Sequence, residues 1–339
     1  MKALVVGLGS IGRRHLANLM KIVPGAEVTV WRRREQMTTV SDQSIRIEHV
    51  VYSLEDALAT EPELAIIATP APFHIQTGLD LARQGISLLI EKPLSDNLAG
   101  TSELIDVCRS NDLTLMVGYN LRFLHSMQIL QRMAKDGQIG HVLSVIAEVG
   151  QYLPDWRPGS DYSQTVSASS RLGGGVLLEL SHEMDYVRWL IGEVETVNAQ
   201  IALLDDLKMD AENVADIVLR FTTGILGNIH LDMLQRTPAR KCKLIGTQGT
   251  LVWDGIANTV RLFSAESKMW HDVFIEQAWD RNEMYILELQ HFLDCVQSKS
   301  QPLVTGEDGL RGLEIILAAR ESARLQKTIY LKGMFSEKY

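Results

Sequence analysis

Cysteine is scarce in this sequence. Its 339 residues include three cysteines, Cys108, Cys242 and Cys295, which lie far apart. They have neither the close spacing of zinc ligands nor the even number that a disulfide framework requires. Isolated thiols of this kind are typical of a reducing compartment, so the sequence predicts a cytoplasmic protein.

Long apolar runs and an excess of positive charge are also missing. No stretch of roughly eighteen residues is uninterruptedly apolar, which excludes a transmembrane helix. The N-terminus leads directly into an apolar segment at residues 3–6, without the cationic leader and cleavage site of a signal peptide. The net charge of −9 argues against the basic surface by which proteins bind nucleic acid.

What remains has the composition of a soluble globular protein, with 46% hydrophobic and 22% charged residues. No internal repeat, low-complexity tract or long linker interrupts the sequence. A chain of 339 residues exceeds the size at which one hydrophobic core usually divides into two. We therefore expect two domains.

The first 120 residues alternate apolar segments with amphipathic ones. Segments typical of strands occupy residues 2–6, 27–31, 49–52, 64–68, 86–90 and 114–118. Helical periodicity or helix-start signals lie between them. Strands that alternate with helices predict a doubly wound parallel sheet, an α/β domain of the Rossmann type at residues 1–120.

A glycine-rich turn, Gly7-Leu8-Gly9-Ser10-Ile11-Gly12, joins the first predicted strand to the first predicted helix. This context turns a weak pattern into the dinucleotide fingerprint. Gly7 makes the tight turn, Gly9 lets the backbone approach a pyrophosphate, and Gly12 lets the helix pack on the strand. The free N–H groups of the helix N-terminus would then face the phosphates. The alternative is a merely structural turn.

The end of the second predicted strand indicates which dinucleotide is bound. NAD-binding folds usually place an acid there to hold the ribose 2′-hydroxyl, and here Arg32 occupies that place. A guanidinium suits a 2′-phosphate, so the sequence favours NADP over NAD. Trp31 or Arg33 could cover the adenine. The alternative is a solvated basic loop.

Glu91-Lys92-Pro93 follows a strongly apolar segment at residues 86–90. Ligands of open parallel sheets bind at the carboxyl ends of the strands, where this lysine would lie. A lysine beside a bound cofactor can stabilise a developing alkoxide. The alternative is a surface lysine followed by a turn proline.

The second part of the chain, residues 121–339, has a different pattern. Strand-like segments at 141–152, 196–204, 211–221, 225–234, 240–245, 250–253 and 259–263 follow one another with few helices between them. Such a series predicts an open, mainly antiparallel sheet. Two helices at 283–297 and 306–325 and a short strand at 328–331 close an α+β domain.

A predicted helix at residues 176–190 carries a second group of functional residues. It follows Gly173-Gly174-Gly175, and it places Glu179 three residues before His182. Side chains at that spacing meet on a helix, and a carboxylate orients a histidine as a general base. Such a histidine can accept the hydroxyl proton of a substrate while a hydride leaves the same carbon. The alternative is an amphipathic helix with a solvated polar face.

Taken together, these segments resemble the Gfo/Idh/MocA family, which is named after glucose–fructose oxidoreductase, inositol dehydrogenase and MocA. The resemblance covers nearly the whole chain. It rests on the glycine-rich turn, Ala68-Thr69-Pro70 through His74, Glu91-Lys92-Pro93, Val117-Gly118-Tyr119-Asn120 with Arg122-Phe123, Gly173-Gly174-Gly175 through His182 and Asp185, and Thr305-Gly306-Glu307-Asp308-Gly309.

The resemblance implies an NAD(P)-dependent oxidoreductase that acts on a hydroxyl or keto carbon of a sugar, cyclitol or sugar derivative. Lys92 and His182 match the catalytic residues of the family. Glu179 departs from it, since the family commonly has an aspartate four residues before the histidine. The segment from Gly173 to Tyr186 resembles a branch in bacterial surface-sugar pathways. Family members often form dimers or tetramers through the exposed sheet face.

Three sets of candidate residues follow. The catalytic set is Lys92, His182 and Glu179. The cofactor-binding set is Gly7, Gly9, Ser10, Ile11, Gly12, Trp31, Arg32, Arg33, Thr69, Pro70, His74, Glu91, Lys92 and Asn120. The substrate-binding set is Tyr119, Arg122, Trp156, Arg157, Asp161, Tyr162 and Asp185, in which aromatic planes and bidentate groups suit a sugar. No metal-ligand cluster is visible in the sequence, so we expect no metal.

Two other functions stay open at this point. The chain could be a cofactor-binding regulator or sensor on the same fold, because function depends on the site rather than on the fold. It could also be a glycosidase that oxidises its substrate transiently with NAD. The presence of both Lys92 and His182 favours the dehydrogenase over the sensor.

Overall fold

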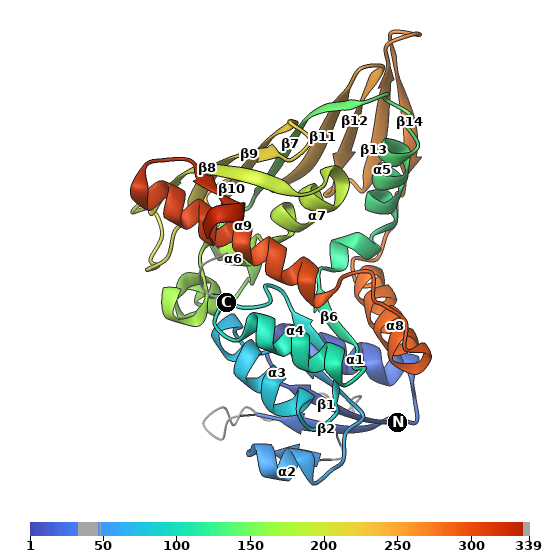
Figure 1. The fold of residues 1–339 in the computed structure, drawn as a ribbon, viewed down its shortest axis with the longest axis vertical. Helices are drawn as coiled ribbons and strands as arrows, with labels where there is room; N and C mark the ends of the chain where they lie inside the picture. The colour runs from blue at the N-terminus through green and yellow to red at the C-terminus, as the bar shows by residue number, and fades with distance from the viewer. Residues whose placement is uncertain (33–46, 48, 335–339) are drawn as a thin grey trace. The chain divides into compact units, whose positions relative to one another are not determined.

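A computed structural model describes residues 1–32, 47 and 49–334 of the chain (Figure 1). These residues form two compact units. The first unit contains residues 1–120 and 281–310, and the second contains residues 121–280 and 311–339. None of the helices in the described part of the chain is long and apolar enough to cross a membrane.

The first unit is built on a parallel sheet of six strands in the order β3-β2-β1-β4-β5-β6. The strands are β1 (Lys2–Val6), β2 (Glu27–Trp31), β3 (His49–Val51), β4 (Leu64–Ile67), β5 (Ser87–Glu91) and β6 (Leu115–Gly118). The central strands β4 and β5 are buried along their whole length, which explains their continuous apolar sequence. This is the doubly wound sheet that the alternating pattern predicts.

The helices of this unit are α1 (Ser10–Ile22), α2 (Leu54–Leu58), α3 (His74–Ala82), α4 (Thr101–Ser110) and α8 (Glu283–Ser298), with a 3₁₀ turn at Ala71–Phe73. The strand order reverses direction between β1 and β4. Right-handed crossovers therefore put α1 and α3 on opposite faces of the sheet. Figure 1 shows α3 packed beside α4, and α1 beside α8.

Helix α8 comes late in the sequence but packs with the first unit. The sequence analysis assigned all residues after 120 to the second domain, whereas residues 281–310 belong to the first unit. The apolar side of α8 is buried, including Met284, Leu289 and Phe292. The side-chain amides of Asn18 on α1 and Asn282 before α8 donate to each other's oxygens, at 3.2 and 2.8 Å.

The second unit is built on a nine-stranded sheet in the order β14-β13-β12-β11-β7-β10-β9-β8-β15. Its strands are β7 (Val142–Gly150), β8 (Val194–Ala202), β9 (Val214–Phe221), β10 (Leu226–Asp232), β11 (Ala239–Gly246), β12 (Gly249–Asp254), β13 (Thr259–Ser264), β14 (Met269–Ile275) and β15 (Ile329–Tyr330). The pair β7–β10 is parallel, and the other pairs are antiparallel. In β9 buried and outward residues alternate, as expected when one face covers a core.

Helices pack against one face of this sheet (Figure 1). They are α5 (His125–Lys135), α6 (Val176–Glu179), α7 (His182–Ile191), α9 (Gly306–Leu325), which begins in the first unit, and α10 (Leu331–Met334). Short 3₁₀ turns cover Asn120–Phe123, Leu153–Trp156, Tyr162–Gln164, Val166–Ala168 and Ser170–Leu172.

The helix predicted at residues 176–190 is in fact two helices. Helix α6 ends at Glu179, and α7 begins at His182 after Leu180 and Ser181. Three successive residues of α6, Val176 to Leu178, are buried. Successive residues of a helix point in directions about 100° apart, so this segment is enclosed by protein rather than lying on one face. The single-helix spacing argument for Glu179 and His182 was therefore wrong.

Candidate active site

The glycine-rich turn has the geometry that a dinucleotide needs. Gly7 has φ +89°, and a Cβ there would lie 2.8 Å from the carbonyl oxygen of Ala68. A Cβ on Gly12 would lie 2.2 Å from the carbonyl oxygen of Gly7, so helix α1 packs closely on the turn. A Cβ on Gly9, in contrast, would meet no atom of the described residues within 4 Å. Gly7 and Gly12 are thus required by the fold, while the space beside Gly9 is open for a ligand.

Helix α1 begins at Ser10, directly after Gly9. No acidic residue lies in its first turn, and no side chain caps it. The N–H groups of this end and its positive dipole are therefore available to an anion. Ser10 is exposed and Ile11 is half-buried at this terminus. The residues present fit a pyrophosphate here.

Trp31 ends strand β2, and Arg32 follows it. Both side chains are half-buried. The main-chain N–H of Arg32 donates to the carbonyl of Val51, at 3.1 Å, which fixes the backbone at the end of β2 against β3. Arg33, the other candidate for covering an adenine, lies outside the described residues.

His74 connects the turns that follow β4 and β5. Its ring is buried, with Nε2 2.7 Å from the carbonyl oxygen of Thr69 and Nδ1 3.0 Å from that of Pro93. Burial lowers the pKa of His74, against the effect of these two carbonyls. A neutral ring donates through one nitrogen at a time. His74 therefore supports the two turns that carry Thr69, Pro70 and Lys92.

Glu91 is the last residue of β5 and is buried. Its Oε1 lies 2.6 Å from Nε2 of His15 on α1, and its Oε2 accepts weakly from the main-chain N–H of Lys92, at 3.3 Å. The sequence analysis placed Glu91 in the cofactor-binding set and did not consider His15.

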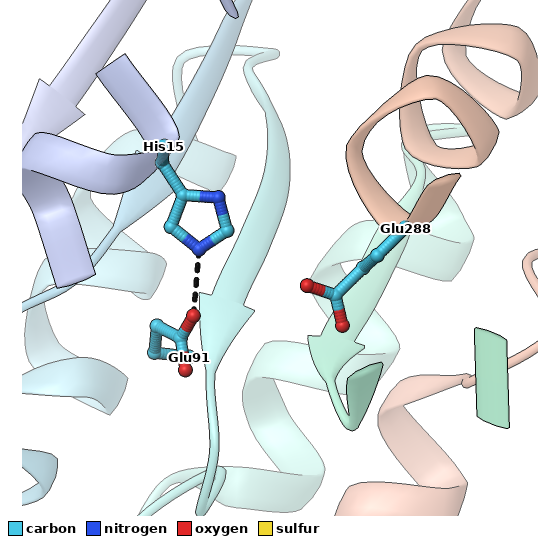
Figure 2. Close-up of side chains that lie close together, drawn as sticks. All are labelled: His15, Glu91 and Glu288. Carbon is cyan, nitrogen blue, oxygen red and sulfur yellow. Dashed lines mark hydrogen bonds and ion pairs between the residues drawn. The ribbon is translucent and has the colours of Figure 1, made fainter. Parts of the chain in front are cut away.

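Two residues of this region, His15 and Glu288, were missed by sequence reasoning. Glu288 on α8 is fully buried and lies with His15 and Glu91 in a group whose ligating atoms are within 4.8 Å of one another. Figure 2 shows its carboxyl group turned toward the His15–Glu91 pair. The sequence does contain a signal for Glu288, because this acid lies at helical spacing among the buried residues Met284, Phe292 and Cys295. An acid in such a series marks a polar cluster in the core.

Asn120 and Tyr119 follow strand β6. Both are buried, and Tyr119 is fully enclosed. The side chain of Asn120 interacts with the hydroxyl of Tyr285, whose pKa is raised by burial and then by the charge of Glu91. Tyr119 thus lies in the interior of the first unit, although it was expected to contact substrate.

In the second unit, His182 begins α7 and Glu179 ends α6. His182 is 8% exposed, and Glu179 is half-buried. The three glycines before α6 have structural tasks: Gly173 and Gly175 have φ of +78° and +96°, and a Cβ on Gly174 would lie 2.3 Å from the carbonyl oxygen of Val166. The close approach is thus to backbone oxygens at Gly174 and to the side chain of Glu212 at Gly175, all within this unit.

Arg122 and Asp185, both expected to contact substrate, are buried and bound to each other. Nε of Arg122 donates to Oδ2 of Asp185 at 2.9 Å, and Nη2 donates to Oδ1 at 2.6 Å. The guanidinium also lies over the ring of Trp189, at 5.5 Å from its centre. This bidentate pair ties the segment after β6 to α7.

Four further candidates line or adjoin a small hollow in the second unit. Trp156, Arg157 and Tyr162 line it together with Leu153, Ser160, Thr165 and Ser167. The indole N–H of Trp156 donates to the carbonyl of Gln151, and the hydroxyl of Tyr162 accepts from the N–H of Lys208. Asp161 is exposed and accepts from the N–H of Ser163 at the start of a 3₁₀ turn. The structure thus brings these aromatic and charged groups to one place.

Comparisons with known proteins agree with this arrangement. Residues 1–119 match the model of the oxidoreductase family with an NAD-binding Rossmann fold, and residues 127–252 match the GFO/IDH/MocA C-terminal domain. A myo-inositol 2-dehydrogenase of Thermotoga maritima is 27% identical over 98% of this chain and 99% of its own length.

Solved structures show the same fold. A levoglucosan dehydrogenase in complex with NADH has a TM-score of 0.86 and 19% identity, covering 98% of this chain and 99% of the other. The WlbA dehydrogenase of Bordetella pertussis, in complex with NADH and UDP-GlcNAcA, has a TM-score of 0.81 and 22% identity, covering 97% and 98%. The two family models together span most of the chain, so this protein belongs to the Gfo/Idh/MocA family of oxidoreductases.

Proposed function

We propose that this protein is an NAD(P)-dependent oxidoreductase that acts on a hydroxyl or keto carbon of a sugar, cyclitol or sugar derivative. The observation that carries the proposal lies within the first unit. The turn with open space beside Gly9 and the turn with Lys92 both follow carboxyl ends of strands in one parallel sheet, β1 and β5. Ligands of such sheets bind at this edge.

The roles of two residues follow from the reaction. When bound, the nicotinamide accepts or returns the hydride. In the oxidation direction His182 accepts the hydroxyl proton, and the ammonium of Lys92 stabilises the negative charge that develops on oxygen. Glu179 orients the ring of His182. A non-catalytic sensor would have no use for the first two groups.

The cofactor preference that we propose is for NADP. Arg32 stands at the end of β2, where its fork can bind a 2′-phosphate. Ser10, Ile11 and the glycines hold the pyrophosphate, Trp31 or Arg33 covers the adenine, and Thr69, Pro70 and Asn120 line the remaining length of the dinucleotide. The levoglucosan and WlbA dehydrogenases were crystallised with NADH, so this preference would set the chain apart from them.

For the substrate we propose a carbohydrate that contacts Trp156, Arg157 and Tyr162, which lie close together in the second unit, and their neighbour Asp161. An aromatic plane stacks on a sugar ring, and a guanidinium can bind a carboxylate or phosphate on it. Arg122, Asp185 and Tyr119 support the site from the interior rather than by direct contact. The inositol dehydrogenase and WlbA relatives favour a cyclitol or a nucleotide-linked sugar acid. The resemblance of the segment from Gly173 to Tyr186 favours a role in surface-glycan synthesis.

We further propose a cytoplasmic homodimer or homotetramer assembled through the sheet of the second unit. All three cysteines are free and buried, which supports a reducing compartment. Ile146, Val218 and Leu226 are exposed on three neighbouring strands. Light scattering on the purified protein measures the oligomer, and a charged substitution at Val218 should dissociate it.

The activity is tested by nicotinamide absorbance. The purified protein is mixed with NAD⁺ or NADP⁺ and a panel of myo-inositol, levoglucosan, other polyols and nucleotide-linked sugar acids. Turnover on at least one compound, lost in Lys92→Ala and His182→Ala, is expected. Cofactor binding without turnover on any member of the panel, and without a thermal shift by any of them, would favour the sensor.

A further inference from the structure

The first unit contains a buried group of three ionisable side chains that the proposed reaction does not use directly. His15 comes from α1, Glu91 from the end of β5 and Glu288 from α8 (Figure 2). His15 and Glu288 are fully buried, and Glu91 is 7% exposed. Segments distant in the sequence therefore place two carboxyl groups and one imidazole together in the interior. We call these three side chains the acid cluster.

The bonds within the acid cluster are unequal. His15 Nε2 lies 2.6 Å from Glu91 Oε1, the distance of a charge-assisted bond. Neither oxygen of Glu288 has a hydrogen-bond partner among the described residues. An ionised carboxylate that is fully buried without a partner is strongly unfavourable. Full burial without a hydrogen-bond partner in the described part of the chain therefore favours the neutral acid over the carboxylate at Glu288.

The charge balance supports the same assignment. Burial, and then the negative charge of Glu91, raise the pKa of Glu288 well above its usual value. Other titratable and charged groups lie near the cluster or interact with Tyr285 beside it. They are Arg14 on α1, Lys92 after β5, His74 on α3, Arg281 before α8 and Tyr285 on α8. The ring of Tyr285 lies edge-on to His15, with Arg14 over its face.

The acid cluster is connected to Lys92 through the backbone. The carboxylate of Glu91 that binds His15 also accepts from the main-chain N–H of Lys92. A second negative charge, on Glu288, would repel the carboxylate of Glu91 and weaken its bonds to His15 and to the N–H of Lys92. We therefore expect the conformation at the end of β5 to depend on the proton of the Glu288 carboxyl group.

We propose that Glu288 is a positioning residue: as a neutral acid it keeps Glu91 on His15 and on the N–H of Lys92, and so fixes the strand end that carries Lys92. This role rests on the proposed function, because Lys92 matters for catalysis only if the protein is a dehydrogenase. The protonation state of Glu288 does not depend on that function.

The sign of the pH dependence follows. A carboxyl whose pKa is raised on folding stabilises the protein fully below its unfolded pKa, near 4.5, and the contribution is lost as pH rises through the folded value. The protein should therefore lose stability as pH rises above about 4.5, until the folded pKa of Glu288 is passed. Glu288→Gln, which keeps a neutral group of the same shape, should not show this part of the loss.

The test combines a direct measurement of the proton with stability and kinetics. Infrared spectra of the full-length protein at neutral pH should show the carbonyl band of a buried protonated carboxyl, which Glu288→Gln removes. Glu314→Gln is the matched control, because that buried carboxylate is already paired with Arg311 at 2.6 Å. Melting temperatures from pH 6 to 9 should fall more steeply for wild type than for Glu288→Gln.

Kinetics test the positioning. On a substrate found by the panel, Glu288→Ala should lower kcat by about tenfold to a hundredfold, as misplacement of a catalytic group does, with little change in KM. Glu288→Gln should recover most of the loss and flatten the alkaline limb of the pH profile. If Glu288→Ala does not fold, the infrared and melting comparisons with Glu288→Gln decide the matter.

Three results would overturn the proposal. The first is a spectrum without the protonated band, and the second is wild-type kcat in Glu288→Ala. The third is a divalent metal that co-purifies with wild type and is absent from Glu288→Gln, since the cluster would then bind a cation rather than a proton. The infrared and melting results need no substrate, so they stand even if the panel reveals no activity.

Discussion

Arg122 and Asp185 form a bidentate ion pair in the interior of the second unit, through hydrogen bonds of 2.9 and 2.6 Å. Their side chains are 2% and 1% exposed. Residues of this type at a cleft would bind a charged substrate, but here the fork of the guanidinium is occupied by the carboxylate. The pair holds the first residues after β6 against α7, which begins with His182.

Breaking this pair on one side should be costly. Asp185→Asn leaves a buried guanidinium without its countercharge, and we expect a loss of about 3 to 5 kcal/mol in the free energy of unfolding. The double variant Arg122→Met/Asp185→Leu should lose less, because it removes both charges. Urea denaturation followed by tryptophan fluorescence measures both. Equal stability of Asp185→Asn and wild type would mean that the pair contributes nothing.

Gly9→Asp should abolish cofactor binding and leave the fold intact. A Cβ at Gly9 meets no protein atom, so an aspartate fits, but it places bulk and negative charge where the pyrophosphate binds. Titration with NADPH or NADH, followed by nicotinamide fluorescence, measures the affinity. Gly25→Asp is the control, because a Cβ there also meets open space but lies away from the turn. Wild-type affinity in Gly9→Asp would remove this turn from the cofactor site.

Arg32→Asp should reverse the cofactor preference from NADP to NAD. The 2′-phosphate carries about two negative charges, which a guanidinium attracts and a carboxylate repels. The ratio of kcat/KM for the two cofactors, or of their dissociation constants, measures the change. A wild type that uses NAD at least as well as NADP would show that Arg32 is only a solvated residue.

His182→Ala and Lys92→Ala should each lower kcat by on the order of 10²-fold or more, because each removes a group that acts on the reacting oxygen. The affinity for cofactor should barely change in His182→Ala. The double variant should lose less than the product of the two losses, since groups that act as a unit are not additive. Near wild-type turnover in His182→Ala would place the proton acceptor elsewhere.

The sequence predicted much of the fold because local patterns reported burial faithfully. Continuous apolar segments such as β5 indicated strands covered on both faces, and the glycine-rich turn lies between β1 and α1 with Gly7 and Gly12 in the tight contacts expected of them. Strand β14, which is largely exposed, was not predicted because its residues lack a buried face. Elements without a core contact leave little trace in hydrophobic pattern.

The candidate site could be predicted only in part. Contacts such as Glu91 with His15 join residues 76 positions apart, and no local pattern specifies which buried groups meet. The break between α6 and α7 was not predicted, because an enclosed helix has no polar side that would indicate where it ends. Arg122 and Asp185 were recognised as notable, but a pattern of residue types cannot show that two of them neutralise each other.

The late return of α8 to the first unit has a consequence for synthesis on the ribosome. The parallel sheet is complete in sequence at residue 120, yet its unit closes only when residue 310 has emerged, 190 residues later (310 − 120). At translation rates of about 5 to 20 residues per second, that interval lasts roughly 10 to 40 s. During this time the nascent sheet and α1 lack the helix that encloses His15, so the order of translation leaves the cofactor unit open until residues 121–280 of the second unit have been made.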